Sequence, residues 1–167
     1  FNNIFFEGKP LKMGKPSYSR KIGVEMIYQD LGLCRQHTAI ENIFLGYEIK
    51  KGGFWLDHKS MKSKVLELIE HLNADIPLNH AVGLMSGGQQ QAVAIARSLV
   101  SDPKLIIMDE PTAALGQKET KKVLDLILSL KKKGIAVLLI SHNQSDIKKV
   151  TGRNIVLEQG KLKKNHR

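Results

Sequence analysis

The fold is decided by residues 84–112, LMSGGQQQAVAIARSLVSDPKLIIMDEPT. A glycine-bearing start leads into an alanine-rich stretch, and Pro103 separates this stretch from an apolar run that ends in two acids and a proline. Glycine loses more backbone freedom on ordering than any other residue, so Gly87 and Gly88 make a poor start for an ordinary helix. They indicate that something approaches the backbone closely at this point.

Two apolar runs predict strands. The first is KLIIMDEP at residues 104–111, and the second is IAVLLISH at residues 135–142. Near-continuous apolar runs are typical of strands buried on both faces. A helical pattern from about Lys118 to Lys132 lies between them and leads through Gly134 to the second run. Strand, helix and strand with short links predict a parallel pair with a right-handed crossover.

The two ends of the chain predict further strands. Residues 2–13 alternate apolar and polar around a Gly-Lys-Pro turn, which predicts a strand pair. Residues 22–30, IGVEMIYQD, predict a strand that ends at Gln29. After the second apolar run we expect a helix from about Gln144 and two strands, at residues 154–159 and 161–164.

Helix signals fill the segment between these strands. Thr38 and Glu41 have the spacing of a capping box, and Gly46 closes the short helix that they begin. Asp57 is placed to cap a second helix. The apolar residues of this second helix recur at helical spacing: Val65, Leu66, Ile69 and Leu72.

These patterns predict one domain, residues 1–167, with an insertion. We expect an α/β core formed by residues 1–35 and 97–167 and a mostly helical subdomain formed by residues 36–96, which includes the glycine-bearing helix start. A chain of 167 residues that is 42% hydrophobic is long enough for one such core and too short for two.

Composition narrows the classes of partner. The net charge of +10 would suit an anionic partner, but the lysines are scattered along helical stretches, and aromatic residues make up only 5% of the chain. We therefore expect no nucleic-acid partner.

The single cysteine, Cys34, excludes an internal disulfide and a thiol metal cluster. No apolar run is long enough to cross a bilayer.

Polar residues follow three predicted strands. In an open parallel sheet, ligands bind outside the carboxyl ends of the strands, where Asp109, Glu110 and His142 are expected. Asp109 is suited to hold Mg²⁺, partly through water, and Glu110 to orient or deprotonate an attacking water. His142 would contact a terminal phosphate, and Gln29 would meet the metal or the water. Taken alone, the acidic pair fits a helix cap or a surface salt bridge equally well. A lone His142 is more often structural, and a lone Gln29 is an ordinary surface residue. Three residues together at strand ends favour a site.

The chain resembles the ATPases of the ATP-binding cassette (ABC) family. MSGGQ, LIIMDEPT, AALG and SH occur in the order and spacing of the signature, Walker B, D-loop and switch histidine, and YQDLGL resembles the Q-loop. The resemblance covers essentially the whole chain. It implies a P-loop NTPase-like ABC ATPase core, here partial, with an inserted α-helical subdomain, and it implies ATP and Mg²⁺ as cofactors.

The resemblance also assigns roles. Ser86, Gly87, Gly88 and Gln89 would bind the γ-phosphate of ATP held by the opposite subunit of a dimer. A helix start with free N–H groups attracts an anion, which agrees with that role. By the same resemblance, Asp109 and Gln29 bind Mg²⁺, and Glu110 and His142 carry out hydrolysis.

The expected function is transport. YQDL, NIFLG, QAVAIAR and TAALG are similar to ATPase subunits of bacterial monosaccharide importers of the ribose and fructose type. This implies a second ATPase subunit, membrane permease subunits and, indirectly, a solute-binding protein, at the cytoplasmic face of the cell membrane. Residues 43–45 either line the permease contact or belong to the core.

Two departures from the family pattern stand out. The phosphate-binding Gly-x-x-x-x-Gly-Lys-Ser/Thr loop (Walker A) is missing, since Gly8-Lys9-Pro10 and Gly14-Lys15-Pro16 carry proline where serine or threonine is needed. The resemblance places that loop before residue 1, so the sequence as it stands is expected to bind ATP poorly. Gly116 replaces the usual D-loop aspartate.

Alternatives to a transport ATPase stay open at this stage. A soluble ABC protein of DNA repair would carry a long coiled coil where this chain has residues 36–96, whereas one of translation is harder to exclude, given the positive charge. The chain could also be a degenerate ATPase subunit that does not hydrolyse ATP. The presence of Glu110 and His142 argues against this alternative, whereas Gly116 and the missing Walker A loop leave it open.

Overall fold

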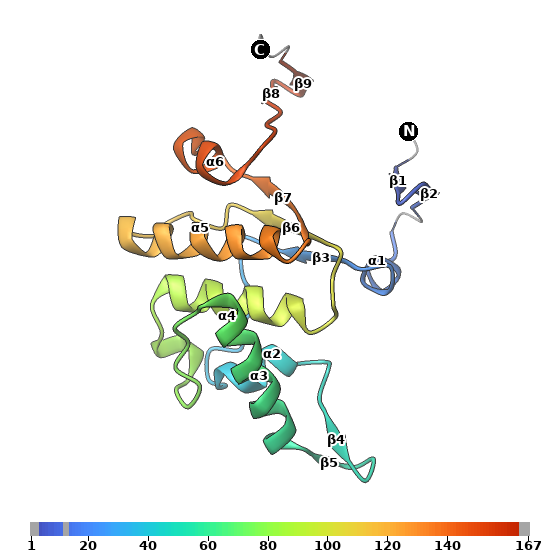
Figure 1. The fold of residues 1–167 in the computed structure, drawn as a ribbon, viewed down its shortest axis with the longest axis vertical. Helices are drawn as coiled ribbons and strands as arrows, with labels where there is room; N and C mark the ends of the chain where they lie inside the picture. Colours follow the sequence, from blue (N-terminus) through green and yellow to red (C-terminus); the bar gives the residue numbers. More distant parts are fainter. Residues whose placement is uncertain (1–3, 12–13, 164–167) are drawn as a thin grey trace.

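The computed structural model describes residues 4–11 and 14–163, and its centre is a three-stranded parallel sheet (Figure 1). The strand order is β3 (Val24–Ile27), β6 (Leu105–Asp109), β7 (Ala136–Ile140). Ile27 pairs with Met108, and Asp109 pairs with Ile140, so the carboxyl ends of the three strands lie at one edge. The predicted parallel pair is confirmed, and β3 ends two residues before Gln29.

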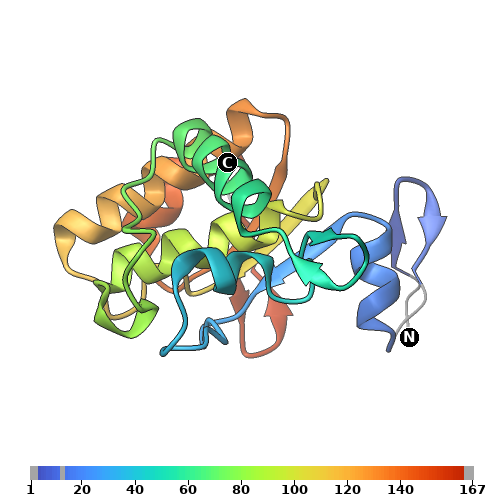
Figure 2. The same ribbon diagram turned by 90° about the horizontal axis from the view of Figure 1, so that it is seen from below.

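Helix α4 (Gly87–Leu99) is the centre of the packing. It contacts β3 and α5 (Gln117–Lys132) on one side and α2 (Ala39–Phe44) and α3 (His58–Leu72) on the other. Every residue from Gln91 to Ala96 is buried. Small alanine side chains at Ala92, Ala94 and Ala96 let neighbouring helices approach on several sides. Seen from below, α2 and α3 lie in front of α4 (Figure 2).

Both predicted helix caps of the 36–96 segment are present. The Thr38 hydroxyl accepts from the Glu41 N–H, and the Glu41 carboxylate accepts from the Thr38 N–H at 2.8 Å. Asp57 accepts from the Ser60 N–H at 3.0 Å and begins α3. Of the apolar residues predicted along α3, Leu66 is exposed because it lies about 100° around the helix from the buried Val65.

One prediction about the sheet is wrong. Strands β6 and β7 are not buried on both faces: β6 buries Ile106 and Met108, whereas β7 leaves Leu138 and Ile140 about half exposed. The reason is that α5 packs against one side of β7, and the part of the chain that the structure describes leaves the other side open to solvent.

Shorter elements complete the fold. The predicted terminal strand pairs are antiparallel hairpins of two-residue strands, and parts of both predicted segments (residues 2–3, 12–13 and 164) lie outside the described residues. The helix predicted from Gln144 is confirmed, whereas α1, η1 and the β4–β5 hairpin were not predicted. The bounds are β1 (Phe5–Phe6), β2 (Lys9–Pro10), α1 (Pro16–Lys21), β4 (Lys50–Lys51), β5 (Trp55–Leu56), η1 (Val82–Leu84), α6 (Gln144–Val150), β8 (Leu157–Glu158) and β9 (Lys161–Leu162). Among the described helices, none is both long and apolar enough to cross a membrane.

Candidate functional site

The structure brings Glu110 and His142 together at the carboxyl ends of β6 and β7. Glu110 Oε1 accepts from the His142 backbone N–H at 2.9 Å and lies 2.7 Å from His142 Nδ1. The Glu110 backbone has a φ of +48° and donates its N–H to the Ile140 carbonyl at 2.9 Å. Sheet pairing therefore continues one residue past β6 and sets the direction of the Glu110 side chain.

The exposures of these two side chains differ. The Glu110 side chain is 18% exposed, whereas that of His142 is 83% exposed. Ser141 donates a longer hydrogen bond, 3.4 Å, to the second carboxylate oxygen of Glu110. A carboxylate held from one side with its other oxygen loosely bonded is suited to accept a proton from water, and the exposed imidazole is free to turn toward a ligand.

Asp109 and Gln29 lie at the same sheet edge. Asp109 is the last residue of β6 and is half-buried, and Gln29 is exposed in the loop after β3. Within residues 4–11 and 14–163, there is no group of three or more His, Cys, Asp or Glu side chains that would hold a metal ion. A carboxylate and an amide oxygen still fit Mg²⁺, which usually keeps several waters and takes one or two protein ligands beside phosphate oxygens.

Ser86 caps helix α4. The Ser86 hydroxyl accepts from the Gln89 N–H at 3.4 Å, and Gln89 Oε1 accepts from the Ser86 N–H at 3.1 Å. The Gln89 side chain is thus engaged in the cap rather than directed to a ligand. The N–H groups of Gly87 and Gly88 belong to the first turn, where helical N–H groups have no partner within the helix.

Glu119 is a further residue of this region, and the sequence did not predict its role. It lies in the first turn of α5 and accepts from the Gly116 N–H at 3.4 Å. The hydroxyl of Ser86, followed by the N–H groups of Gly116 and Gly88, donates to this carboxylate and holds the pKa of Glu119 below its usual value. One carboxylate therefore joins the starts of α4 and α5. Its only sequence signal is the capping-box spacing of Gly116 and Glu119.

Close approach within the chain explains both glycines of the helix start. A Cβ at Gly88 would lie 3.1 Å from the Glu119 Cβ, and a Cβ at Gly87 would lie 2.6 Å from Leu115 Cδ2. The absence of side chains at these positions therefore lets the start of α5 pack closely against α4, and at Gly87 it leaves room for the end of the Leu115 side chain.

Arg97 joins the other end of α4 to the loop after β3. It donates to the carbonyls of Leu31 at 2.6 Å and Gly32 at 2.9 Å. Burial lowers the pKa of Arg97. Helix α4 thus has a polar contact at each end, with Glu119 at its start and with residues 31–32 near its end. The sequence carried no signal for this contact, because 65 residues separate Arg97 from Gly32.

A mostly apolar groove of about 170 Å³ lies beside α2 and α3. Its apolar walls come from Phe44, Leu45, Leu56 and Met61, together with Cys34. Charged and imidazole side chains also line it: His37, Glu41, Glu48 and His58. Of the predicted contact residues 43–45, Ile43 and Phe44 are buried core, and only Leu45 is half-exposed.

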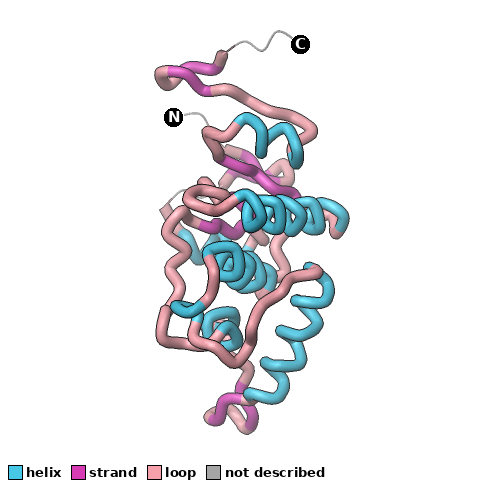
Figure 3. Tube along the Cα trace, turned by 90° about the vertical axis from the view of Figure 1, so that its left-hand side faces the viewer, coloured by secondary structure: helices cyan, strands magenta, loops and turns pink. Residues whose placement is uncertain are grey.

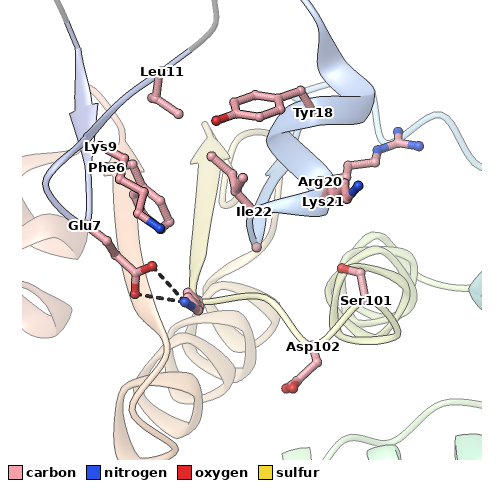
Figure 4. A pocket seen from close by; sticks show the side chains of 12 residues that line it. Phe6, Glu7, Lys9, Leu11, Tyr18, Arg20, Lys21, Ile22, Ser101 and Asp102 are labelled. Carbon is pink, nitrogen blue, oxygen red and sulfur yellow. Dashed lines mark hydrogen bonds and ion pairs between the residues drawn. The ribbon is translucent and has the colours of Figure 1, made fainter.

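A second cavity, about 330 Å³, lies between the β1–β2 hairpin and α1 (Figure 4). Lys104 Nζ bonds both carboxylate oxygens of Glu7 on its wall, at 2.7 and 2.9 Å. None of the predicted site residues lines this cavity. The strand-end residues and the α4 start are therefore the better candidate site.

A parallel sheet with acids and a histidine at its strand ends, beside a glycine-bearing helix start, defines the class of α/β phosphate-binding ATPase domains. The family model described as "ABC transporter" matches residues 2–113. The chain belongs to this family.

Three curated relatives extend the comparison. The chain is 44% identical over 161 residues to the xylose/arabinose import ATP-binding protein XylG of Sulfolobus acidocaldarius, covering 96% of the chain and 64% of that protein. It is 40% identical to the fructose import ATP-binding protein FrcA of Rhizobium meliloti, with coverages of 90% and 61%. It is 38% identical to the ribose import ATP-binding protein RbsA of Streptococcus agalactiae, with coverages of 94% and 32%. The chain thus spans less than two thirds of these relatives.

Solved structures agree with this fold. A nucleotide-free ATP-binding cassette from an ABC transporter aligns with a TM-score of 0.82 at 25% identity, over 96% of this chain and 67% of that one. A bacterial ABC transporter cassette solved as a dimer aligns with a TM-score of 0.68 at 25% identity, over 89% of this chain and 66% of that one. The predicted α/β ABC ATPase fold is confirmed.

Proposed function

We propose that the protein is the ATP-binding and ATP-hydrolysing subunit of an importer that takes up a small solute of the monosaccharide class. The observation that carries the proposal is the Glu110–His142 contact at the carboxyl ends of β6 and β7. The solute class rests on the similarity to xylose/arabinose, fructose and ribose import ATP-binding proteins.

In the proposed reaction, Glu110 is the general base. Its carboxylate takes a proton from the attacking water, while the His142 backbone N–H holds Oε1 at 2.9 Å and fixes the direction of the side chain. The His142 imidazole turns from Glu110 to the terminal phosphate. Asp109 and Gln29 would hold Mg²⁺, partly through water, and the ion would neutralise charge on the phosphate oxygens.

The second half of the site is the α4 start. Ser86, Gly87 and Gly88 bind the γ-phosphate of ATP carried by a second ATPase subunit, and Gln89 holds the cap in shape. The exposure of Ser86 and Gly87 supports this role, because a partner subunit can reach them. Two subunits would then enclose two ATP molecules.

Coupling to transport would use the helical part of the chain. In this proposal, residues 36–96 form a subdomain inserted into a core of residues 1–35 and 97–167. The groove beside α2 and α3 receives a helix of a permease subunit at the cytoplasmic face of the membrane, with a solute-binding protein on the far side. Arg97 passes the movement between the loop after β3 and the end of α4, since it bonds carbonyls of that loop.

The test is Glu110→Gln in the protein that carries this chain, together with its partner subunits. We expect ATP turnover to fall by roughly 100- to 10,000-fold, while ATP still drives dimerisation. Glu67→Gln is the matched control, because it makes the same change at an exposed position on α3 and should keep full turnover. Equal turnover in Glu110→Gln and the parent protein would remove Glu110 from the catalytic role.

A further inference from the structure

The β4–β5 hairpin projects from the molecule at the end farthest from both termini (Figures 1 and 3). Lys50 pairs with Leu56 and Lys51 pairs with Trp55, and the tip contains Gly52 and Gly53. Both glycines have positive φ, +63° and +82°, a conformation that lets the chain reverse within two-residue strands. The hairpin is therefore a narrow, convex projection.

Two adjacent aromatic side chains are exposed on this projection. Phe54 is 90% exposed and Trp55, the only tryptophan of the chain, is 81% exposed. Single exposed apolar residues are common on protein surfaces, but two neighbouring large aromatic rings at a tip are typical of an interaction site. Large aromatic side chains contribute most to the free energy of folding or binding when they are buried. The exposure of this pair therefore indicates that a partner covers it.

Positive charge surrounds the aromatic pair. Lys50 and Lys51 lie on the strand opposite Trp55 and Leu56, and residues 50–56 contain no acid. Lys59 and Lys62, at the start of α3, are also exposed. The two nearest acids bond locally: Glu48 accepts from the Gly46 N–H at 2.9 Å, and Asp57 caps α3.

We propose that this hairpin is a membrane-contact element that inserts Phe54 and Trp55 into the interface of an anionic lipid bilayer. Tryptophan and phenylalanine rings partition into the boundary between headgroups and acyl chains, while lysine stems reach back to the lipid phosphates. Each lysine near an anionic surface strengthens binding about fivefold. This inference rests on the proposed function in one respect, which is that it places the protein beside a membrane. Leu56 and His58 also line the groove assigned to the permease, so a permease bound there would bring the hairpin close to the bilayer.

The shape of the hairpin favours lipid over a protein surface. Protein hot spots usually pair an anchor with a preformed pocket and surround it with a ring of contacts that exclude water. The hairpin has strands of two residues and a convex tip, so it offers little flat area for such a ring. A fluid interface accommodates a convex aromatic tip without a matching pocket.

Trp55 lies beside the tip of the hairpin, so the part of the emission change that is lost in Trp55→Phe reports on this hairpin. Trp55 emission is recorded while the protein is titrated with vesicles of phosphatidylglycerol and phosphatidylethanolamine and, separately, with phosphatidylcholine vesicles. We expect a saturable shift to shorter wavelength with the anionic vesicles and a much weaker one with phosphatidylcholine. Because no nucleotide is needed, the outcome is independent of the ATPase test on Glu110.

Variants distinguish the contribution of the hairpin to vesicle binding from that of the overall net charge. Phe54→Ser keeps the Trp55 reporter and should lower the vesicle partition coefficient roughly tenfold. Lys50→Glu with Lys51→Glu should lower it at least 25-fold, or about fivefold for each lysine. The matched control is Lys131→Glu with Lys132→Glu, at the exposed end of α5, which makes the same charge change away from the hairpin. Unchanged far-UV circular dichroism would show that each variant is folded.

Two results would overturn the proposal. The first is Trp55 emission that does not respond to anionic vesicles, including the case in which it responds only to a purified permease. The second is an equal loss of binding in the α5 control, which would mean that only net charge matters. Neither result bears on Glu110, so the proposed ATPase function would stand or fall separately.

Discussion

The two halves of the candidate site are built in different ways. At the strand ends, backbone pairing between β6 and β7 continues through Glu110 to Ile140 and sets the Glu110–His142 contact. At the α4 start, side chains make the connections, since Glu119 joins Ser86 to the start of α5. The first half is held by the sheet itself, whereas the second depends on a few polar contacts near the surface.

This difference suggests which half can move. Backbone hydrogen bonds between parallel strands break only when the sheet opens. The contacts of Glu119 are charge-assisted and partly exposed, so water or a bound anion can replace them at little cost. The α4 start is therefore the half better suited to respond to a phosphate, while the strand ends keep their geometry.

The sharpest way to test this comparison is Ser86→Arg. The bulky side chain would crowd the phosphate position at the α4 start and leave the Glu110–His142 contact untouched. We expect turnover in the protein that carries this chain to fall by roughly 100-fold or more, together with a loss of about 1 kcal/mol of unfolding free energy because the α4 cap is removed. An unaffected rate would overturn the role of the α4 start. Ser63→Arg, at an exposed position of α3, makes the same substitution away from both halves.

A smaller effect is expected from Gly88→Val. A Cβ at this position meets the Glu119 Cβ at 3.1 Å, so a branched side chain must push α5 away from α4. Overpacking of this kind typically costs about 1–3 kcal/mol of unfolding free energy, which urea titration would measure. Gly152→Val is the control, because a Cβ there meets nothing within 4 Å. If both variants lose the same stability, the α4–α5 contact is not tight.

The parts of the fold that the sequence predicted are those with local signals. The caps at Thr38 and Asp57 each join residues three apart, so spacing alone identifies them. The ends of β6 and β7 were also predictable, because a long apolar run stops abruptly at polar residues. These signals predicted the strand-end half of the candidate site.

The parts that the sequence did not predict depend on distant residues. Arg97 meets the carbonyl of Leu31 across 66 positions of the chain. Glu119 meets Ser86 only after α4 and β6 have been placed. The burial of β7 was predicted wrongly, because a run of apolar residues does not say which elements will cover it. Local spacing thus predicted the candidate site, whereas tertiary packing supplies the contacts between its residues.

The smallest expected effect is the pH dependence that Glu119 gives to stability. Hydrogen bonds from Ser86, Gly116 and Gly88 hold the pKa of Glu119 below the ordinary value of 4.5. A group with a lowered pKa in the folded state stabilises the fold above its unfolded pKa, and this contribution is lost as the pH falls through its folded pKa. The contribution should therefore be complete at neutral pH and disappear in the acid range below about pH 4.5.

Glu119→Gln and Ser86→Ala test this contribution. Unfolding by urea between neutral and acid pH should show Glu119→Gln less stable than the parent protein at neutral pH and equal to it at the acid end. Ser86→Ala removes the largest cause of the lowered pKa, so the pKa of Glu119 in NMR titration should move back up. Gln117→Ala, at an exposed position in the same turn of α5, is the control and should leave both measurements unchanged. If the Glu119 pKa does not move in Ser86→Ala, then the carboxylate does not join α4 to α5. The α4 start would then have to be held by its own cap, and the contrast with the strand ends would lose its physical basis.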